Sequence, residues 1–154
     1  MTGALILEDG AVFAGESVGA DGFAFGEAVF TTSMTGYQEV ATDPSFEGQI
    51  VCFTAPMVGN YGVDERRSES KRTHATAVVM REARGPEWTD WLHGQGVVGL
   101  TGVDTRSLVL HLPSPAARGP HAALRRCRDR PRLPLRASRL PRADAGQANA
   151  CRHR

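Results

Sequence analysis

Three cysteines, Cys52, Cys127 and Cys151, are the strongest nucleophiles in the sequence. A catalytic cysteine needs an exposed thiol whose pKa is lowered by a nearby base or helix N-terminus. Cys52 lies instead within the apolar run of residues 50–53, without the glycine-flanked turn that exposes such a thiol. We therefore expect Cys52 to be buried and inert. No two cysteines have C-x-x-C spacing and three cannot all pair within one chain, so we expect neither a disulfide scaffold nor a zinc site.

Histidines and glycines indicate no metal or phosphate site either. His74, His93 and His111 stand isolated in the first part of the sequence, and no pair has the spacing of metal ligands. The stretch around Gly22 and Gly26 lacks the Lys-Ser/Thr pair of a phosphate-binding loop. We expect this chain to contain no catalytic residue, no metal and no cofactor.

The elements that would position a site follow from hydrophobic periodicity. Strands are predicted at about 4–8, 11–15, 26–33, 49–56, 75–80 and 97–100. Asp9-Gly10 favours a two-residue hairpin, and the glycine-rich residues 15–26 are expected to form a loop. A helical turn is predicted near 37–41, a helix from Pro86, and a helix capped by Asp104. Together, these elements predict an α/β domain with more strand than helix.

The composition changes abruptly at residue 113. Residues 1–112 contain seven basic and 15 acidic residues, whereas residues 113–154 contain 11 arginines and two acidic residues. The second segment holds six of the nine prolines and no valine, isoleucine, methionine, phenylalanine, tyrosine or tryptophan. It cannot bury enough apolar surface to offset its ordering entropy, so we expect a disordered tail. Because it also lacks lysine and glutamate, we interpret it as a GC-rich gene translated in a shifted frame.

Five short strings in the first segment carry a resemblance to a known family. They are LEDG at 7–10, SMTGYQE at 33–39, TDPS at 42–45, GNYG at 59–62 and GVDTR at 102–106. In order and spacing they resemble the N-terminal domain of the small (glutaminase) subunit of carbamoyl phosphate synthase, over about residues 4–112. The resemblance implies a three-layer β/β/α domain at 1–112, incomplete at its C-terminal end.

The resemblance also implies a function. The family's small subunit hydrolyses glutamine and passes ammonia to a large subunit, which makes carbamoyl phosphate from bicarbonate and ATP for arginine and pyrimidine synthesis. The catalytic cysteine, histidine and acid belong to a glutaminase domain that is absent here, so we expect the isolated chain to be inactive. ATP and magnesium belong to the large subunit, the expected partner. The N-terminus contains no signal peptide or membrane span, so a cytoplasmic location is expected.

Ser45 is the one candidate site residue. The resemblance implies that the serine of TDPS contacts L-glutamine bound in the missing glutaminase domain, and a hydroxyl can both donate and accept hydrogen bonds. From the residues alone, a turn at 43–45 whose side chains bond nearby backbone is the favoured interpretation, and the resemblance brings the two interpretations to about even. Tyr37, Gln38 and Glu39 likewise allow two interpretations, a polar patch for the partner subunit or a capped helical turn with Tyr37 in the core; we favour the second.

A second hypothesis is a non-catalytic, stand-alone interaction domain whose basic tail binds nucleic acid by counterion release. Against it, residues 113–154 contain no aromatic side chain for base stacking and no RGG-like repeat. We therefore favour the first hypothesis, a domain that docks to the large subunit and supports the glutamine site.

Overall fold

The computed structural model describes residues 1–112 and 121–126. Its elements in chain order are β1 (Thr2–Leu7), β2 (Val12–Gly19), β3 (Phe23–Thr31), α1 (Tyr37–Thr42), the 3₁₀ turn η1 (Pro44–Phe46), β4 (Gln49–Phe53), the 3₁₀ turn η2 (Glu65–Arg67), β5 (Ala77–Val79), α2 (Pro86–Gly94), β6 (Val98–Thr101), α3 (Thr105–His111) and β7 (His121–Arg126). The predicted α/β class, with more strand than helix, is confirmed.

The strands form one closed barrel in the order β1-β2-β6-β5-β4-β3-β7, and β7 pairs with both β1 and β3. Pairing is parallel from β3 through β4 and β5 to β6, and antiparallel elsewhere. The apolar run in β4 is buried from Ile50 to Phe53, as expected of a parallel strand that is covered on both faces.

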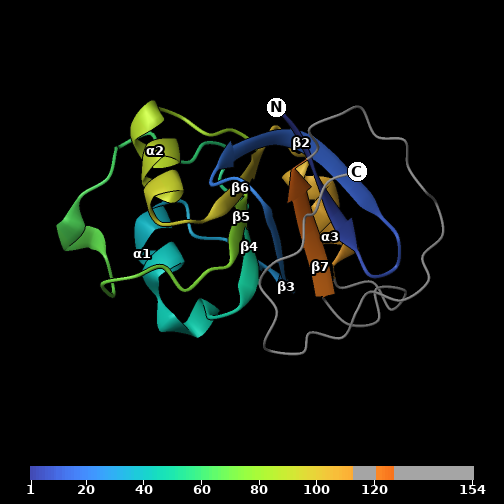
Figure 1. The fold of residues 1–154 in the computed structure, drawn as a ribbon, viewed down its shortest axis with the longest axis horizontal. Coiled ribbons are helices and arrows are strands. Elements are labelled where there is room, and N and C mark those ends of the chain that lie inside the picture. Colours follow the sequence, from blue (N-terminus) through green and yellow to red (C-terminus); the bar gives the residue numbers. More distant parts are fainter. Residues whose placement is uncertain (113–120, 127–154) are drawn as a thin grey trace, which may run out of the picture.

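Two hydrophobic cores lie on opposite faces of the parallel strands. The first fills the barrel and contains Leu5 of β1, Cys52 of β4 and Leu124 of β7, with Leu108 of α3. The second lies outside the barrel, where α1 and α2 cover the parallel strands and Trp88 is fully buried. Figure 1 shows α1 and α2 on one side of β4, β5 and β6, with β7 on the other. The order of the layers in space is compatible with the predicted β/β/α arrangement, but the strands form a single closed barrel and not two separate sheets.

Two local predictions were wrong. Residues 15–26 are not a loop, because β2 continues to Gly19 and β3 begins at Phe23. The glycines permit close strand contact: a Cβ atom at Gly15 would lie 2.4 Å from the Thr101 carbonyl oxygen, and one at Gly19 would lie 2.5 Å from that of Val97. The hairpin between β1 and β2 has four residues outside the strands, 8–11, rather than two.

The expectation of disorder beyond residue 112 needs correction for one segment. Residues 121–126 form β7, which closes the barrel at the C-terminal end of the domain, where we expected the domain to be incomplete. Composition misled here because Ala122 and Leu124 suffice to face the barrel core, where both are buried. The rest of the predicted tail, residues 113–120 and 127–154, lies outside the described residues.

Candidate functional site

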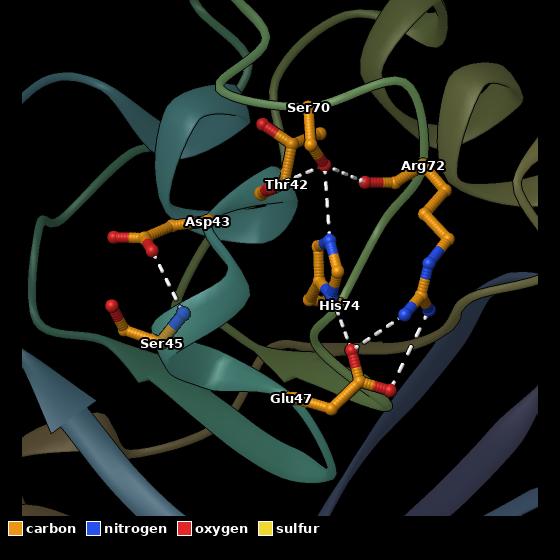
Figure 2. A network of polar contacts seen from close by, with 7 residues as sticks. All are labelled: Thr42, Asp43, Ser45, Glu47, Ser70, Arg72 and His74. Carbon is orange, nitrogen blue, oxygen red and sulfur yellow. Dashed lines mark hydrogen bonds and ion pairs between the residues drawn. The ribbon is translucent and has the colours of Figure 1, made fainter.

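Ser45 lies in η1, the turn that leads from α1 into β4. Pro44 occupies the first turn of η1, and the Ser45 backbone N–H donates to Asp43 Oδ1 at 2.8 Å (Figure 2). Asp43 therefore caps the turn, as the backbone interpretation of this string predicted. Ser45 itself is exposed at the surface. The turn is thus present, and it holds Ser45 where another molecule can reach it.

The surroundings of Asp43 favour the charged form of its carboxyl group. Hydrogen bonds from the Ser45 backbone and side chain lower the pKa of the Asp43 carboxyl, and the nearby His74 ring lowers it further. Because hydrogen bonding favours the charged form, the carboxylate keeps its hold on the turn well below neutral pH.

A second set of polar contacts lies beside this turn. Glu47 follows η1, and its carboxylate contacts His74 Nδ1 and Arg72, whose Nη2 lies 3.1 Å from Glu47 Oε2. His74 Nε2 is 3.1 Å from Ser70 Oγ on the other side of the ring. Figure 2 shows the His74 ring standing between Glu47 and Ser70. The hydrogen bond with His74, with support from Arg72, lowers the pKa of Glu47.

The sequence suggested that His74 is isolated, but in the structure it has close side-chain partners. Its partners Glu47 and Ser70 are 27 and four residues away in the chain. Its side chain is only 10% exposed, and its backbone N–H donates to the Ala41 carbonyl at the end of α1. No periodic pattern or motif in the sequence pointed to this contact.

The SMTGYQE and GNYG strings meet at the start of α1. The Tyr61 hydroxyl accepts a 2.5 Å hydrogen bond from the Gly36 N–H, and the Tyr37 hydroxyl donates to the Gly62 carbonyl at 2.6 Å. The two rings stack with centroids 4.3 Å apart. Tyr61 thus caps a helix for which Gly36 has no side-chain cap.

Gln38 is fully buried and fixes the following loop. Its Nε2 donates to the Asp64 carbonyl at 2.8 Å and to Ser68 Oγ at 2.9 Å, while its Oε1 accepts from the Asp64 N–H at 3.0 Å. The favoured interpretation, a helical turn with Tyr37 in the core, is confirmed. The burial of Gln38 was missed, because nothing local distinguishes a buried glutamine from an exposed one.

Cys52 lies within β4 and is 2% exposed. Burial raises the pKa of its thiol to about 12. Cys52 is a free cysteine, and residues 1–112 and 121–126 contain no group of three or more His, Cys, Asp or Glu side chains that could hold a metal ion. In the same part of the chain, no helix has both the length and the hydropathy that crossing a membrane requires.

Two surface grooves have volumes of about 670 and 530 Å³. The larger one is lined by Gln38, Ser70 and Trp91 among others, and the smaller one by Arg81, Asp104 and Arg106 among others. Ser45 lines neither groove.

Comparison with known proteins gives the family. A family model described as carbamoyl-phosphate synthase small chain, CPSase domain, matches residues 5–118 and so passes the predicted boundary at 112. A relative named carbamoyl phosphate synthase small chain from Streptomyces avermitilis is 51% identical over 118 residues, which cover 70% of this chain and 30% of the relative. A relative of the same name from Akkermansia muciniphila is 47% identical over 129 residues, which cover 76% of this chain and 34% of the relative.

This chain spans about a third of the length of the curated relatives that it matches. With the family model covering most of the chain and the identity near one half, the chain belongs to the carbamoyl-phosphate synthase small-chain family, through its CPSase domain.

Proposed function

We propose that this chain is the non-catalytic part of a glutamine-hydrolysing subunit, and that it supports a glutamine site formed mainly by another domain. The observation that carries the proposal is the exposed Ser45 on a turn braced by Asp43 and Pro44. A hydroxyl held in one place can bond the carboxylate or the ammonium group of glutamine with little loss of conformational entropy. The reaction that it would serve is the synthesis of carbamoyl phosphate from glutamine, bicarbonate and ATP.

The described residues have no group suited to attack the glutamine amide. Acyl transfer needs an exposed nucleophile with a base in reach. Cys52 is buried with its pKa raised to about 12, so it is protonated at neutral pH. The thiol, the imidazole and the acid would therefore come from the glutaminase domain, and this chain alone would not hydrolyse glutamine.

A large ATP-using subunit is the proposed protein partner. The relatives are named small chains, which supports a larger companion, and ATP and magnesium would bind there. The barrel with α1 and α2 on one flank would take the place of the family's β/β/α layers, with the TDPS turn facing the glutaminase domain.

The test is a chimera in which residues 5–112 of this chain replace the matched segment of the Streptomyces avermitilis small chain, assembled with its large subunit. Ser45→Ala should raise the KM for glutamine by roughly 10-fold or more, as expected from the loss of a hydrogen bond to a charged group. Ser33→Ala, at another exposed serine, is the matched control and should leave KM unchanged. Equal KM values for Ser45→Ala and the unmodified chimera would refute the role of Ser45.

A further inference from the structure

We infer that Ser70 is a positioning residue for Ser45, because its hydroxyl holds the peptide group from which the turn of Ser45 begins. The inference rests on the proposed function, since the place of Ser45 matters for activity only if Ser45 contacts a ligand. Its evidence is a set of hydrogen bonds that join residues 69–74 to the end of α1, although Ser70 and Thr42 are 28 positions apart in the chain.

The Ser70 hydroxyl connects two segments of the chain. Its oxygen lies 2.7 Å from the carbonyl oxygens of both Thr42 and Arg72, and 3.1 Å from His74 Nε2 (Figure 2). The single hydroxyl proton can bond either carbonyl oxygen. Arg72 and His74 belong to the same loop as Ser70, so these two contacts shape the loop itself. The positioning effect on Ser45 belongs to the bond with Thr42.

A second hydrogen bond joins the same loop to Thr42, and it does not involve the Ser70 proton. The Glu69 backbone N–H donates to Thr42 Oγ1 at 2.9 Å, and the Thr42 hydroxyl donates to the Gln38 carbonyl at 2.8 Å. Thr42 is only 1% exposed. The side chain and the carbonyl of Thr42 are therefore both in contact with neighbouring residues of one loop, Glu69 and Ser70.

The bond to the Thr42 carbonyl also orients Asp43. This carbonyl and the Asp43 N–H belong to one planar peptide group, so a contact that holds the carbonyl holds the orientation of the whole group. The Asp43 N–H makes a longer bond, 3.4 Å, to the Val40 carbonyl. Ser70 thus supplies the shorter of these two contacts at the peptide group that joins α1 to the turn.

The orientation of Asp43 determines the place of Ser45. The Asp43 carboxylate accepts from the Ser45 N–H at 2.8 Å, and the Asp43 carbonyl accepts from the Phe46 N–H at 3.0 Å. Pro44 lies between Asp43 and Ser45, and its ring restricts φ. Few free torsions therefore separate the peptide group that Ser70 contacts from the Ser45 side chain.

Backbone hydrogen bonds hold the course of the segment independently of Ser70. The His74 N–H donates to the Ala41 carbonyl at 2.9 Å, and the Gly48 N–H donates to the His74 carbonyl at 3.3 Å. These bonds lie before and after the turn, and Ser70 itself is only partly buried. We therefore expect Ser70→Ala to fold normally and to loosen the turn of Ser45 without changing the rest of the domain.

The first test measures glutamine kinetics in the chimera with the Streptomyces avermitilis small chain. Ser70→Ala should raise the KM for glutamine by roughly threefold or more, as expected from the loss of one neutral hydrogen bond, and leave kcat and the ammonia-dependent rate unchanged. Because Ser70 acts through Ser45, Ser70→Ala should raise KM no further when Ser45→Ala is already present. An unchanged KM in Ser70→Ala, or the same fold-change with and without Ser45→Ala, would overturn the inference.

Ser68→Ala is the matched control. Ser68 is partly buried in the same loop, and its hydroxyl accepts a 2.9 Å hydrogen bond from Gln38 Nε2. Ser68→Ala therefore removes a contact between this loop and α1 but none with the peptide group of Thr42, and it should leave the KM unchanged. An equal rise in KM for both variants would assign the effect to a loosened loop and overturn the role of Ser70.

The second test needs no glutamine and uses the full 154-residue chain. NMR should show that the Ser45 and Phe46 amides exchange with solvent severalfold faster in Ser70→Ala, whereas Ser68→Ala should leave both rates unchanged. Unchanged exchange at Ser45 in Ser70→Ala would refute the inference. If Ser45→Ala leaves the KM unchanged, the proposed function fails by itself, and the exchange rates still decide whether Ser70 positions Ser45.

Discussion

Cys52 and Ser45 have opposite surroundings although they are only seven positions apart in the chain. The Cys52 side chain faces the barrel core, where desolvation disfavours the thiolate, whereas Ser45 sits at the surface on a braced turn. In this domain, burial decides which side chain is accessible to another molecule. The intrinsic nucleophilicity of the residue type does not decide it.

A direct prediction concerns Cys52. With a thiol pKa of about 12, only roughly one molecule in ten thousand carries the thiolate at pH 8. The purified chain should therefore release no ammonia from glutamine above a Cys52→Ala control. Alkylation followed by peptide mapping should modify Cys52 only after denaturation. Turnover that depends on Cys52, or rapid alkylation of the native protein, would contradict the account.

At the scale of elements, α1 depends on Tyr61 from a distant loop. The N-cap residue Gly36 offers no side chain, and the Tyr61 hydroxyl accepts a hydrogen bond from the Gly36 N–H. Tyr61→Phe keeps the ring that stacks on Tyr37 but removes this acceptor. We expect a loss of about 1 kcal/mol in the free energy of unfolding, measured in urea, and faster hydrogen exchange at Gly36. Unchanged exchange at Gly36 would exclude the cap.

Elements with local causes were predictable from the sequence. Pro86 marks the start of α2, Asp104 caps α3 through the Ser107 N–H at 3.1 Å, and the apolar run 50–53 gives β4. Each signal lies within a few residues of the element that it predicts.

What could not be predicted depends on partners distant in sequence. Gly19 appeared to be a loop residue because the approach of Val97 is invisible locally. The contact between His74 and Glu47, and the cap that Tyr61 gives to α1, likewise join residues more than twenty positions apart. The turn around Ser45 was predictable, but the contacts that brace it from the His74 side were not.

At the scale of the whole molecule, β7 closes the barrel. It pairs with β1 on one side and β3 on the other, and Leu124 is fully buried among residues of the barrel core. A chain without this strand would expose the edges of β1 and β3 and part of the core, which favours aggregation.

The role of β7 can be measured with two leucine substitutions. Leu124→Ala should lower the free energy of unfolding by about 2–5 kcal/mol, as for other buried leucines. Leu110→Ala is the matched control, because Leu110 is 70% exposed, and its effect should stay within about 0.5 kcal/mol. Equal unfolding midpoints for the two variants would indicate that β7 does not close the barrel in solution.

The central proposal is that this domain contributes Ser45 to a glutamine site. In the chimera with the Streptomyces avermitilis small chain, carbamoyl phosphate synthesis can be measured with glutamine or with free ammonia as the nitrogen source. Ser45→Ala should lower kcat/KM for glutamine by roughly 10-fold or more and leave the ammonia-dependent rate unchanged. A variant that loses both rates in proportion, or neither, would contradict the account.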